Sequence, residues 1–253
     1  MEPRGRRRGT AGHLHAHAVA QPQPLVPLSL FRDRNRSGAY LTMLLVAVGP
    51  MGTFCVITLY LQQVLGFSPL GTGIFWLPFT AGIVVGAGIT PKLLLRVGPR
   101  CIAALGALLS AGAAFWLSTI TVQANYWVDL APAMFLLAVG FGLVVIAVTQ
   151  AAVYRVDPNQ AGIASALLNS AQQLGVALGL AVLAGIAATV TAAPTNQVLP
   201  TGEVLVAGYG TAMIAATGLL LAAAALALVT LDARPAIEED TPDPADALPE
   251  TTR

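Results

Sequence analysis

The chain has 253 residues, of which 56% are hydrophobic and only 10% are charged, and its formal net charge is +1. Soluble domains carry about 25% charged residues, because their surfaces must be hydrated. These proportions exclude a water-soluble fold of this size, and the long charge-free stretches indicate an integral membrane protein.

Residues 1–36 form a basic segment before the first apolar run. Its arginine cluster at residues 4–8 is not followed by the apolar stretch that a signal peptide needs. Such a cluster beside a membrane contacts lipid headgroups or sets orientation, so we expect no nucleic-acid partner. Three alternating histidines at residues 13–17 are interpreted as a chance grouping in a polar tail, and no metal site is predicted.

Six apolar segments follow, and each can cross a bilayer as a helix, which needs roughly 20 residues. The connections between them are short, except for residues 191–207. Together they make a predicted transmembrane domain over residues 37–232, and residues 233–253 are predicted to be an acidic, disordered tail. The predicted helices cover about residues 38–62, 70–94, 101–121, 127–153, 160–190 and 208–231.

Basic residues occur only in alternate connections. If the N-terminus is cytoplasmic, the outer loops contain no Lys or Arg at all. Cytoplasmic loops of membrane proteins are enriched in Lys and Arg. We therefore expect a multi-pass protein of the plasma membrane with both termini in the cytoplasm. The residues on the inner side are then Arg32, Arg34, Arg36, Lys92, Arg96, Arg100, Arg155 and Arg234.

Two features indicate an internal repeat and close helix packing. The second and fifth helices begin with similar links, Ser68-Pro69 and Asp157-Pro158, each followed at the same offset by Gly-Ile. Each link offers an N-cap residue and Pro at the first helical position. Because the links lie on opposite faces, they fit an inverted repeat, although two ordinary helix starts would look the same. Gly82-x-x-x-Gly86 and Gly175-x-x-x-Gly179 are small-residue stripes that suit either static packing or sliding helices.

Few polar residues lie inside the predicted helices, so each is a candidate functional residue. Asn169, Gln172 and Gln173 share one helix face, which suits either an interhelical hydrogen bond or a cavity. Asp129 lies at a helix boundary and is interpreted as interfacial rather than as a proton carrier. The chain has no catalytic triad and no phosphate-binding loop, so we expect neither an enzyme nor a cofactor.

A family resemblance rests on several motifs in a fixed order over about residues 25–190. They are Pro27-Leu28 with Leu30-Phe31-Arg32-x-Arg34, then Leu59-Tyr60-Leu61-Gln62-Gln63-Val64-Leu65-Gly66-Phe67-Ser68-Pro69, then Gly73-Ile74 with Leu77-Pro78, then Pro91-Lys92-Leu93 with Arg96-x-Gly98-x-Arg100, and finally Ala161-Gly162-Ile163-Ala164-Ser165 with Asn169 and Gln173-Leu174-Gly175. Together they resemble the second half of the fourteen-span drug:proton antiporter branch of the major facilitator superfamily.

The resemblance implies an all-α membrane protein whose six transmembrane helices form one half of the major facilitator fold, an inverted 3+3 repeat. It implies a rocker-switch carrier that expels hydrophobic or cationic drug-like compounds in exchange for protons. The cytoplasmic loop motif would be Lys92, Arg96, Gly98 and Arg100. The implied substrate-lining residues, whose aromatic rings suit apolar cations, are Phe54, Tyr60, Gln63, Trp76, Phe79, Phe141, Asn169 and Gln172.

The resemblance covers only one of the two halves that such carriers need around a central site. The other half, with its usual membrane-embedded acid, is not matched in this sequence. We therefore expect the chain to work with a missing N-terminal half or as a homodimer. The alternative is a truncated, non-transporting remnant with no activity of its own.

Overall fold

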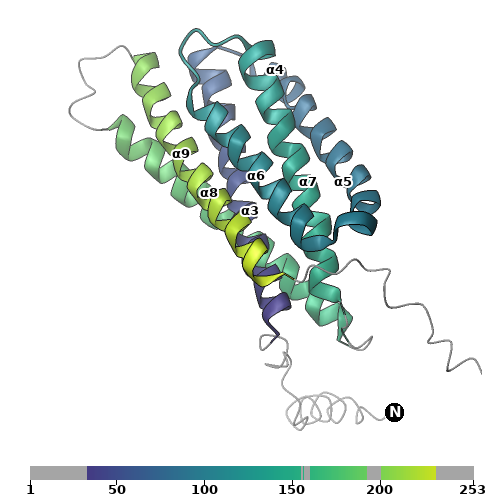
Figure 1. Cartoon of the computed structure of the whole chain (residues 1–253). Coiled ribbons are helices and arrows are strands. Elements are labelled where there is room, and N and C mark those ends of the chain that lie inside the picture. The colour runs from purple at the N-terminus through teal and green to yellow at the C-terminus, as the bar shows by residue number, and fades with distance from the viewer. Residues whose placement is uncertain (1–32, 155, 157–159, 193–200, 232–253) are drawn as a thin grey trace, which may run out of the picture.

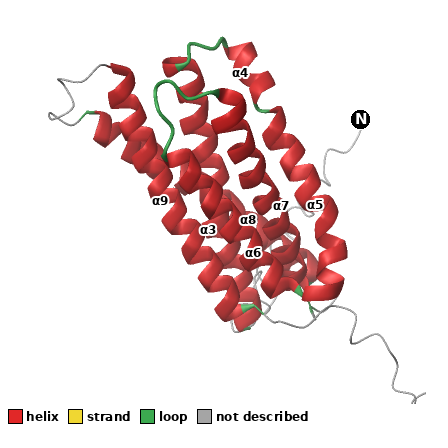
Figure 2. Ribbon diagram, turned by 45° about the horizontal axis from the view of Figure 1, so that its top comes forward, coloured by secondary structure: helices red, strands yellow, loops and turns green. Residues whose placement is uncertain are grey.

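The computed structural model of the chain describes residues 33–154, 156, 160–192 and 201–231. Most of the predicted basic segment, the second of the two similar links and the predicted acidic tail lie outside the described residues. The described part consists of helices and short connections, without strands (Figure 2).

Six helical segments are long and apolar enough to cross a membrane, which confirms the number of predicted helices. Their bounds agree with the prediction to within a few residues, apart from the two differences given below. In chain order the elements are α3 (Arg34–Leu59), the π-helix η1 (Tyr60–Val64), α4 (Pro69–Phe75), α5 (Leu77–Val97), α6 (Pro99–Ser118), the π-helix η2 (Tyr126–Leu130), α7 (Ala131–Val153), α8 (Ala161–Thr191) and α9 (Thr201–Thr230).

Local sequence signals set several of these helix ends. The Ser68 side chain accepts a hydrogen bond from the Gly71 N–H, and Pro69 is the first residue of α4, as predicted. Gly98 separates α5 from α6 with φ of 79°, a left-handed conformation that favours glycine. Pro99 then begins α6, so the loop motif folds as a tight turn rather than as an extended loop.

Two helix boundaries differ from the sequence-based prediction. The last helix begins at Thr201 rather than near residue 208, because Glu203 supplies a negative charge in its first turn and Val204 is buried. The second predicted helix is divided at Trp76 into α4 and α5. Pro78 follows the division, and its lack of an N–H and its ring disfavour an uninterrupted helix there.

The six spans form two triplets, α3 to α6 and α7 to α9, whose helices pair reciprocally. In the first triplet α5 packs along α7 of the second. In the second triplet α8 packs along α3 of the first. The third helices of the triplets, α6 and α9, pack against each other (Figure 1). This exchange is the arrangement expected of an inverted 3+3 repeat, and it confirms the predicted fold class.

Four glycines bring the reciprocal helix pairs into backbone contact. A methyl group on Gly82 or Gly86 of α5 would overlap main-chain atoms of α7. A methyl group on Gly175 or Gly179 of α8 would likewise overlap main-chain atoms of α3. Small residues permit such close approach between membrane helices. The two predicted stripes therefore pack equivalent helix pairs in the two triplets.

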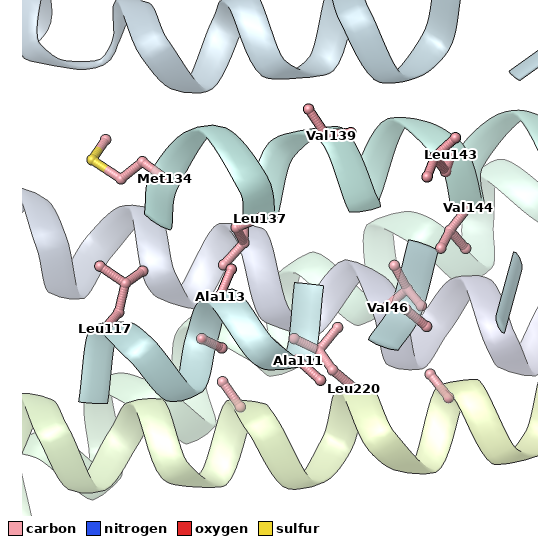
Figure 3. Close-up of a cluster of buried hydrophobic side chains, with 14 of the residues drawn as sticks. Val46, Ala111, Ala113, Leu117, Met134, Leu137, Val139, Leu143, Val144 and Leu220 are labelled. Carbon is pink, nitrogen blue, oxygen red and sulfur yellow. The ribbon is translucent and has the colours of Figure 1, made fainter. Parts of the chain in front are cut away.

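The buried core lies where α3, α6, α7 and α9 meet, and Figure 3 shows part of it. Leu137 of α7 and Leu117 of α6 are fully buried there. A polar contact crosses this apolar region, because the Ser110 hydroxyl donates to the Leu137 carbonyl at 3.1 Å. The core is thus centred on four helices and leaves α5 and α8 with the largest uncovered surfaces.

The charged residues of the described part gather at the two ends of the bundle. We name the end where α3 begins the proximal end, and the end where α3 stops and α9 begins the distal end. Asp129 and Glu203 lie at the distal end. Because successive helices run in opposite directions, five basic residues fall at the proximal end, namely Arg34, Arg36, Lys92, Arg96 and Arg100.

Candidate functional site

The candidate site is an aromatic group that consists of Phe54 of α3, Trp76 at the junction of α4 and α5, and Phe79 of α5. The Trp76 ring centroid lies 4.4 Å from that of Phe54 and 5.2 Å from that of Phe79. The Phe54 ring is inclined by 35° to the indole, and the Phe79 ring by 79°. Trp76 is only 8% exposed and Phe54 is 42% exposed. A buried indole therefore supports an accessible ring.

The helix break places the Trp76 side chain against α3. The Trp76 N–H donates to the Gly73 carbonyl at 3.2 Å, which closes the last turn of α4. The indole Nε1 donates to Thr58 Oγ1 of α3 at 3.2 Å. Phe54 and Thr58 are four residues apart and share one face of α3. Both the ring contact and the hydrogen bond therefore reach Trp76 from a single helix face.

The chemistry of this arrangement suits apolar or cationic ring compounds. Aromatic faces carry partial negative charge, and a cation within about 6 Å of a ring centroid gains about 0.5–2 kcal/mol, more where water is excluded. Phe54 and Phe79 lie inside segments that can span a membrane. Their surroundings are apolar, which favours stacking of hydrophobic compounds as well.

A second aromatic cluster, which the sequence analysis missed, fixes α4 at the distal end. Phe75 stacks on Phe67 with ring centroids 4.6 Å apart, and it meets Tyr126 edge-on at 4.3 Å. The Tyr126 hydroxyl also donates to the Phe75 carbonyl at 2.5 Å. Its sequence signal is the adjacent aromatic pairs Phe75-Trp76 and Tyr126-Trp127, which lie at helix ends. This cluster holds the element that carries Trp76.

Tyr60 and Gln63, both expected to line a cavity, make contacts within the bundle. Tyr60 is fully buried, and its hydroxyl donates to the Thr121 carbonyl at 2.6 Å. Gln63 is exposed, and its Oε1 accepts a hydrogen bond from the Tyr209 hydroxyl at 3.0 Å. These contacts tie η1 to the connection after α6 and to α9. The lining role of both residues stays a prediction.

Asn169 and Gln172 lie far from the aromatic group. Gly175 lies against Leu44 and Gly179 against Val48, so α8 runs parallel to α3 in a fixed register. In this register Asn169 lies beside residue 38 of α3. Residue 38 precedes Phe54 by about 16 residues, which is about 24 Å along the axis of α3. Asn169 is exposed and Gln172 is half-buried. The two amides therefore belong to the proximal half of the bundle.

Phe141 occupies a level between these two groups. Gly82 lies against Phe135 and Gly86 against Val139, so Phe141 is level with residue 88 of α5. That level is about 12 residues, or about 18 Å, from Trp76. Phe141 is half-buried on α7. The expected lining residues are thus distributed along the bundle, and only Phe54, Trp76 and Phe79 form one contact group.

The residues of the predicted cytoplasmic loop motif lie at the proximal end. Lys92 and Arg96 are exposed, Arg100 is half-buried, and Gly98 is buried at the turn. At the same end Arg34 donates from its guanidinium to the Val229 carbonyl at 2.9 Å. A cation at the last turn of α9 interacts favourably with the helix dipole.

These features define a class: a polytopic membrane domain built as an inverted repeat of three helices, with a partly exposed aromatic group inside its spans. The family sequence profile of the Major Facilitator Superfamily matches residues 2–180. The chain belongs to the Major Facilitator Superfamily.

Three similar proteins are drug-resistance or export proteins. The chain is 39% identical over 227 residues to the puromycin resistance protein of Streptomyces alboniger, an alignment that covers 86% of this chain and 45% of the relative. It is 32% identical over 159 residues to the tetracenomycin C resistance and export protein of Streptomyces glaucescens, which covers 62% of this chain and 29% of the relative. It is also 32% identical over 158 residues to the cephamycin export protein of Amycolatopsis lactamdurans, with 62% and 32% covered. The chain spans less than half the length of these relatives.

A substitution at the Tyr60 hydroxyl tests whether this residue serves helix packing or lines a cavity. Replacing Tyr60 with phenylalanine removes the bond to the Thr121 carbonyl, so we expect a loss of about 0.5–1.5 kcal/mol of stability. A thermal unfolding curve of the detergent-solubilised protein measures this loss. If Tyr60 serves packing alone, the substrate range of a working carrier stays the same. A changed range with an unchanged melting temperature would assign Tyr60 to the cavity.

Proposed function

We propose that the chain forms one six-helix half of a proton-coupled carrier that expels hydrophobic or cationic drug-like compounds. The observation that carries this proposal is the aromatic group, in which the exposed Phe54 ring rests on the buried Trp76 indole within a membrane span. Such a surface attracts apolar cations although it carries no charged side chain of its own. The names of these relatives, which describe resistance to or export of antibiotics, support the same substrate class.

The uncovered surface of α8 supports the need for a second half. Ser165, Asn169 and Gln173 are exposed in a segment that can span the membrane. Polar side chains in spans normally face protein or a water-filled cavity rather than lipid. We propose that a second six-helix unit covers this surface, either an N-terminal half or a second copy of the chain. The greater length of the relatives supports the first arrangement.

The second half is also proposed to supply the proton-carrying group. Within the described spans, the acidic residues are Asp129 and Glu203, and both lie near the distal end. The Asp129 carboxylate accepts a hydrogen bond from the Asn125 N–H at 2.7 Å, so it stabilises the start of η2. A carboxylate engaged in this way at a helix start supports a local structural role. Proton exchange is therefore assigned to residues of the second half.

We propose that the proximal end faces the cytoplasm of a cell whose plasma membrane the protein spans. The five basic residues at that end support this orientation. Cys101 offers a test, because it is exposed and lies two residues after Pro99 at the proximal end. In a Cys55→Ala background, a membrane-impermeant maleimide should label Cys101 in inverted vesicles but not in intact cells. A cysteine at Gln123, which is exposed at the distal end, should show the opposite pattern.

Labelling of Cys101 from outside intact cells, together with protection of position 123, would reverse the proposed orientation. The distal control ensures that an absence of labelling reflects topology rather than poor expression.

A chimera tests the proposed function most simply. The chain replaces the matched stretch of the puromycin resistance protein, and the product is expressed in a drug-sensitive bacterial host. We expect puromycin tolerance above that of hosts carrying either part alone. If the chimera reaches the membrane in normal amounts but tolerance stays at the host level, the chain is better described as a non-transporting remnant.

A further inference from the structure

We infer that Thr58 is a positioning residue that fixes the orientation of the Trp76 indole and so determines the preference of the aromatic group for aromatic over aliphatic cations. This inference rests on the proposed function, since it concerns the same binding surface. Thr58 itself is half-buried and has no ring to offer a substrate. Its effect would pass through Trp76.

The hydrogen bond between the two side chains is the first support. Trp76 Nε1 donates to Thr58 Oγ1 at 3.2 Å, across 18 positions in sequence. The indole N–H is a donor only, and a buried Trp normally finds a partner for it. Trp76 is nearly buried, so little water is available to replace the hydroxyl. Loss of the acceptor would therefore favour a different indole orientation.

The ring geometry shows why the orientation matters. The Phe54 ring is tilted by 35° to the indole, while the Phe79 ring stands nearly perpendicular to it. A rotation of the indole would disturb both contacts, because each depends on a different inclination. The backbone adds only a partial constraint, because Trp76 lies at the break between α4 and α5. Thr58 is thus the side chain of α3 that hydrogen-bonds to the indole, beside the ring contact of Phe54.

The consequence is a difference between two kinds of cation. An aromatic cation can stack on the exposed face of Phe54 only if the buried indole behind it keeps that ring in its inclination. An aliphatic cation of the same charge requires attraction to a ring face but no stacking. Disturbing the indole should therefore weaken the binding of aromatic cations selectively. General damage to the fold would weaken the binding of both kinds of cation.

The test compares Thr58→Val, which keeps the shape but removes the acceptor, with Thr58→Ser, which keeps the hydroxyl. Thr80→Val is the matched control, because the Thr80 hydroxyl donates to the Trp76 carbonyl at 3.5 Å and does not contact the indole nitrogen. The full chain is purified in lipid nanodiscs with Trp116 and Trp127 replaced by phenylalanine, so that Trp76 is the sole indole. Binding of tetraphenylphosphonium and tetrabutylammonium is followed by Trp76 fluorescence.

We expect Thr58→Val to weaken tetraphenylphosphonium binding about two- to tenfold, the range that one uncharged hydrogen bond gives. Tetrabutylammonium binding should stay the same, and Thr58→Ser and Thr80→Val should match the parent protein for both cations. The emission spectrum without ligand should differ between Thr58→Val and Thr58→Ser.

Unchanged tetraphenylphosphonium binding in Thr58→Val, or equal weakening of both cations, would overturn the inference and leave the proposed function intact. Failure of the parent protein to bind either cation would count instead against the aromatic group as a binding surface, on which the proposed function rests. In that case the emission spectra still test the hydrogen bond between Thr58 and Trp76. Identical spectra for the two Thr58 variants would show that Thr58 does not position Trp76.

Discussion

Replacing Gly86 with alanine should destabilise the protein markedly, whereas the same replacement at Gly88 should not. A methyl group at Gly86 would overlap the main chain of α7 at Val139, and main-chain atoms cannot move aside as a flexible side chain can. Overpacking of this kind typically costs about 1–3 kcal/mol. Gly88 lies on the same helix with no heavy atom within 4 Å of the added methyl group, so it is a matched control.

The thermal unfolding midpoint of the detergent-solubilised protein measures this difference. The second triplet offers the same comparison, because a methyl group at Gly175 would overlap the main chain of α3 at Leu44, whereas Gly185 has open space. Both pairs should show the same order of stability. Equal melting temperatures within either pair would contradict the reciprocal packing of α5 on α7 and of α8 on α3.

Replacing Phe54 with alanine should greatly reduce drug tolerance in the active chimera. The ring is 42% exposed and leans on Trp76, so its loss removes a cation-binding face with little damage to the core. A cation–π contribution of about 0.5–2 kcal/mol corresponds to about two- to thirtyfold weaker binding. The measurement is the concentration of a cationic drug that halves growth, at matched levels of protein in the membrane.

Phe115 of α6 provides the control for that substitution. It is 58% exposed within a span but lies outside the aromatic group, so Phe115→Ala should leave tolerance nearly unchanged. Equal loss of tolerance in the two variants would mean that the effect of Phe54 is not specific to the aromatic group. Unchanged tolerance in Phe54→Ala would remove the aromatic group from the substrate path.

Much of the fold follows from short-range properties of the sequence. Charge-free runs locate the six spans because lipid tolerates few charges. The Ser68 cap and the Gly98 turn are equally local, so they were predictable. The break at Trp76 was missed because apolar composition continues across it, although Pro78 is a local signal there. The π-helix η1 was not predicted either. The early start of α9 was missed because Gly202 indicates a loop, whereas burial of the following turn stabilises a helix.

The candidate site was predictable in part. Phe54, Trp76 and Phe79 were expected on the basis of the family resemblance, and the structure brings their rings together. Nothing local to the sequence indicates that Asn169 lies about 24 Å from that level, because this separation depends on the register of α8 on α3. The acceptor role of Thr58 toward Trp76 likewise requires two helices to be placed side by side.

Dye efflux from proteoliposomes tests the central claim, that this chain is one half of an export carrier. The purified chain and the chimera are each reconstituted, a pH gradient is imposed, and ethidium efflux is recorded together with the oligomeric state. We predict gradient-dependent efflux by the chimera, and by the chain alone only where it is dimeric. Efflux by the monomeric chain at the rate of the chimera would contradict the account.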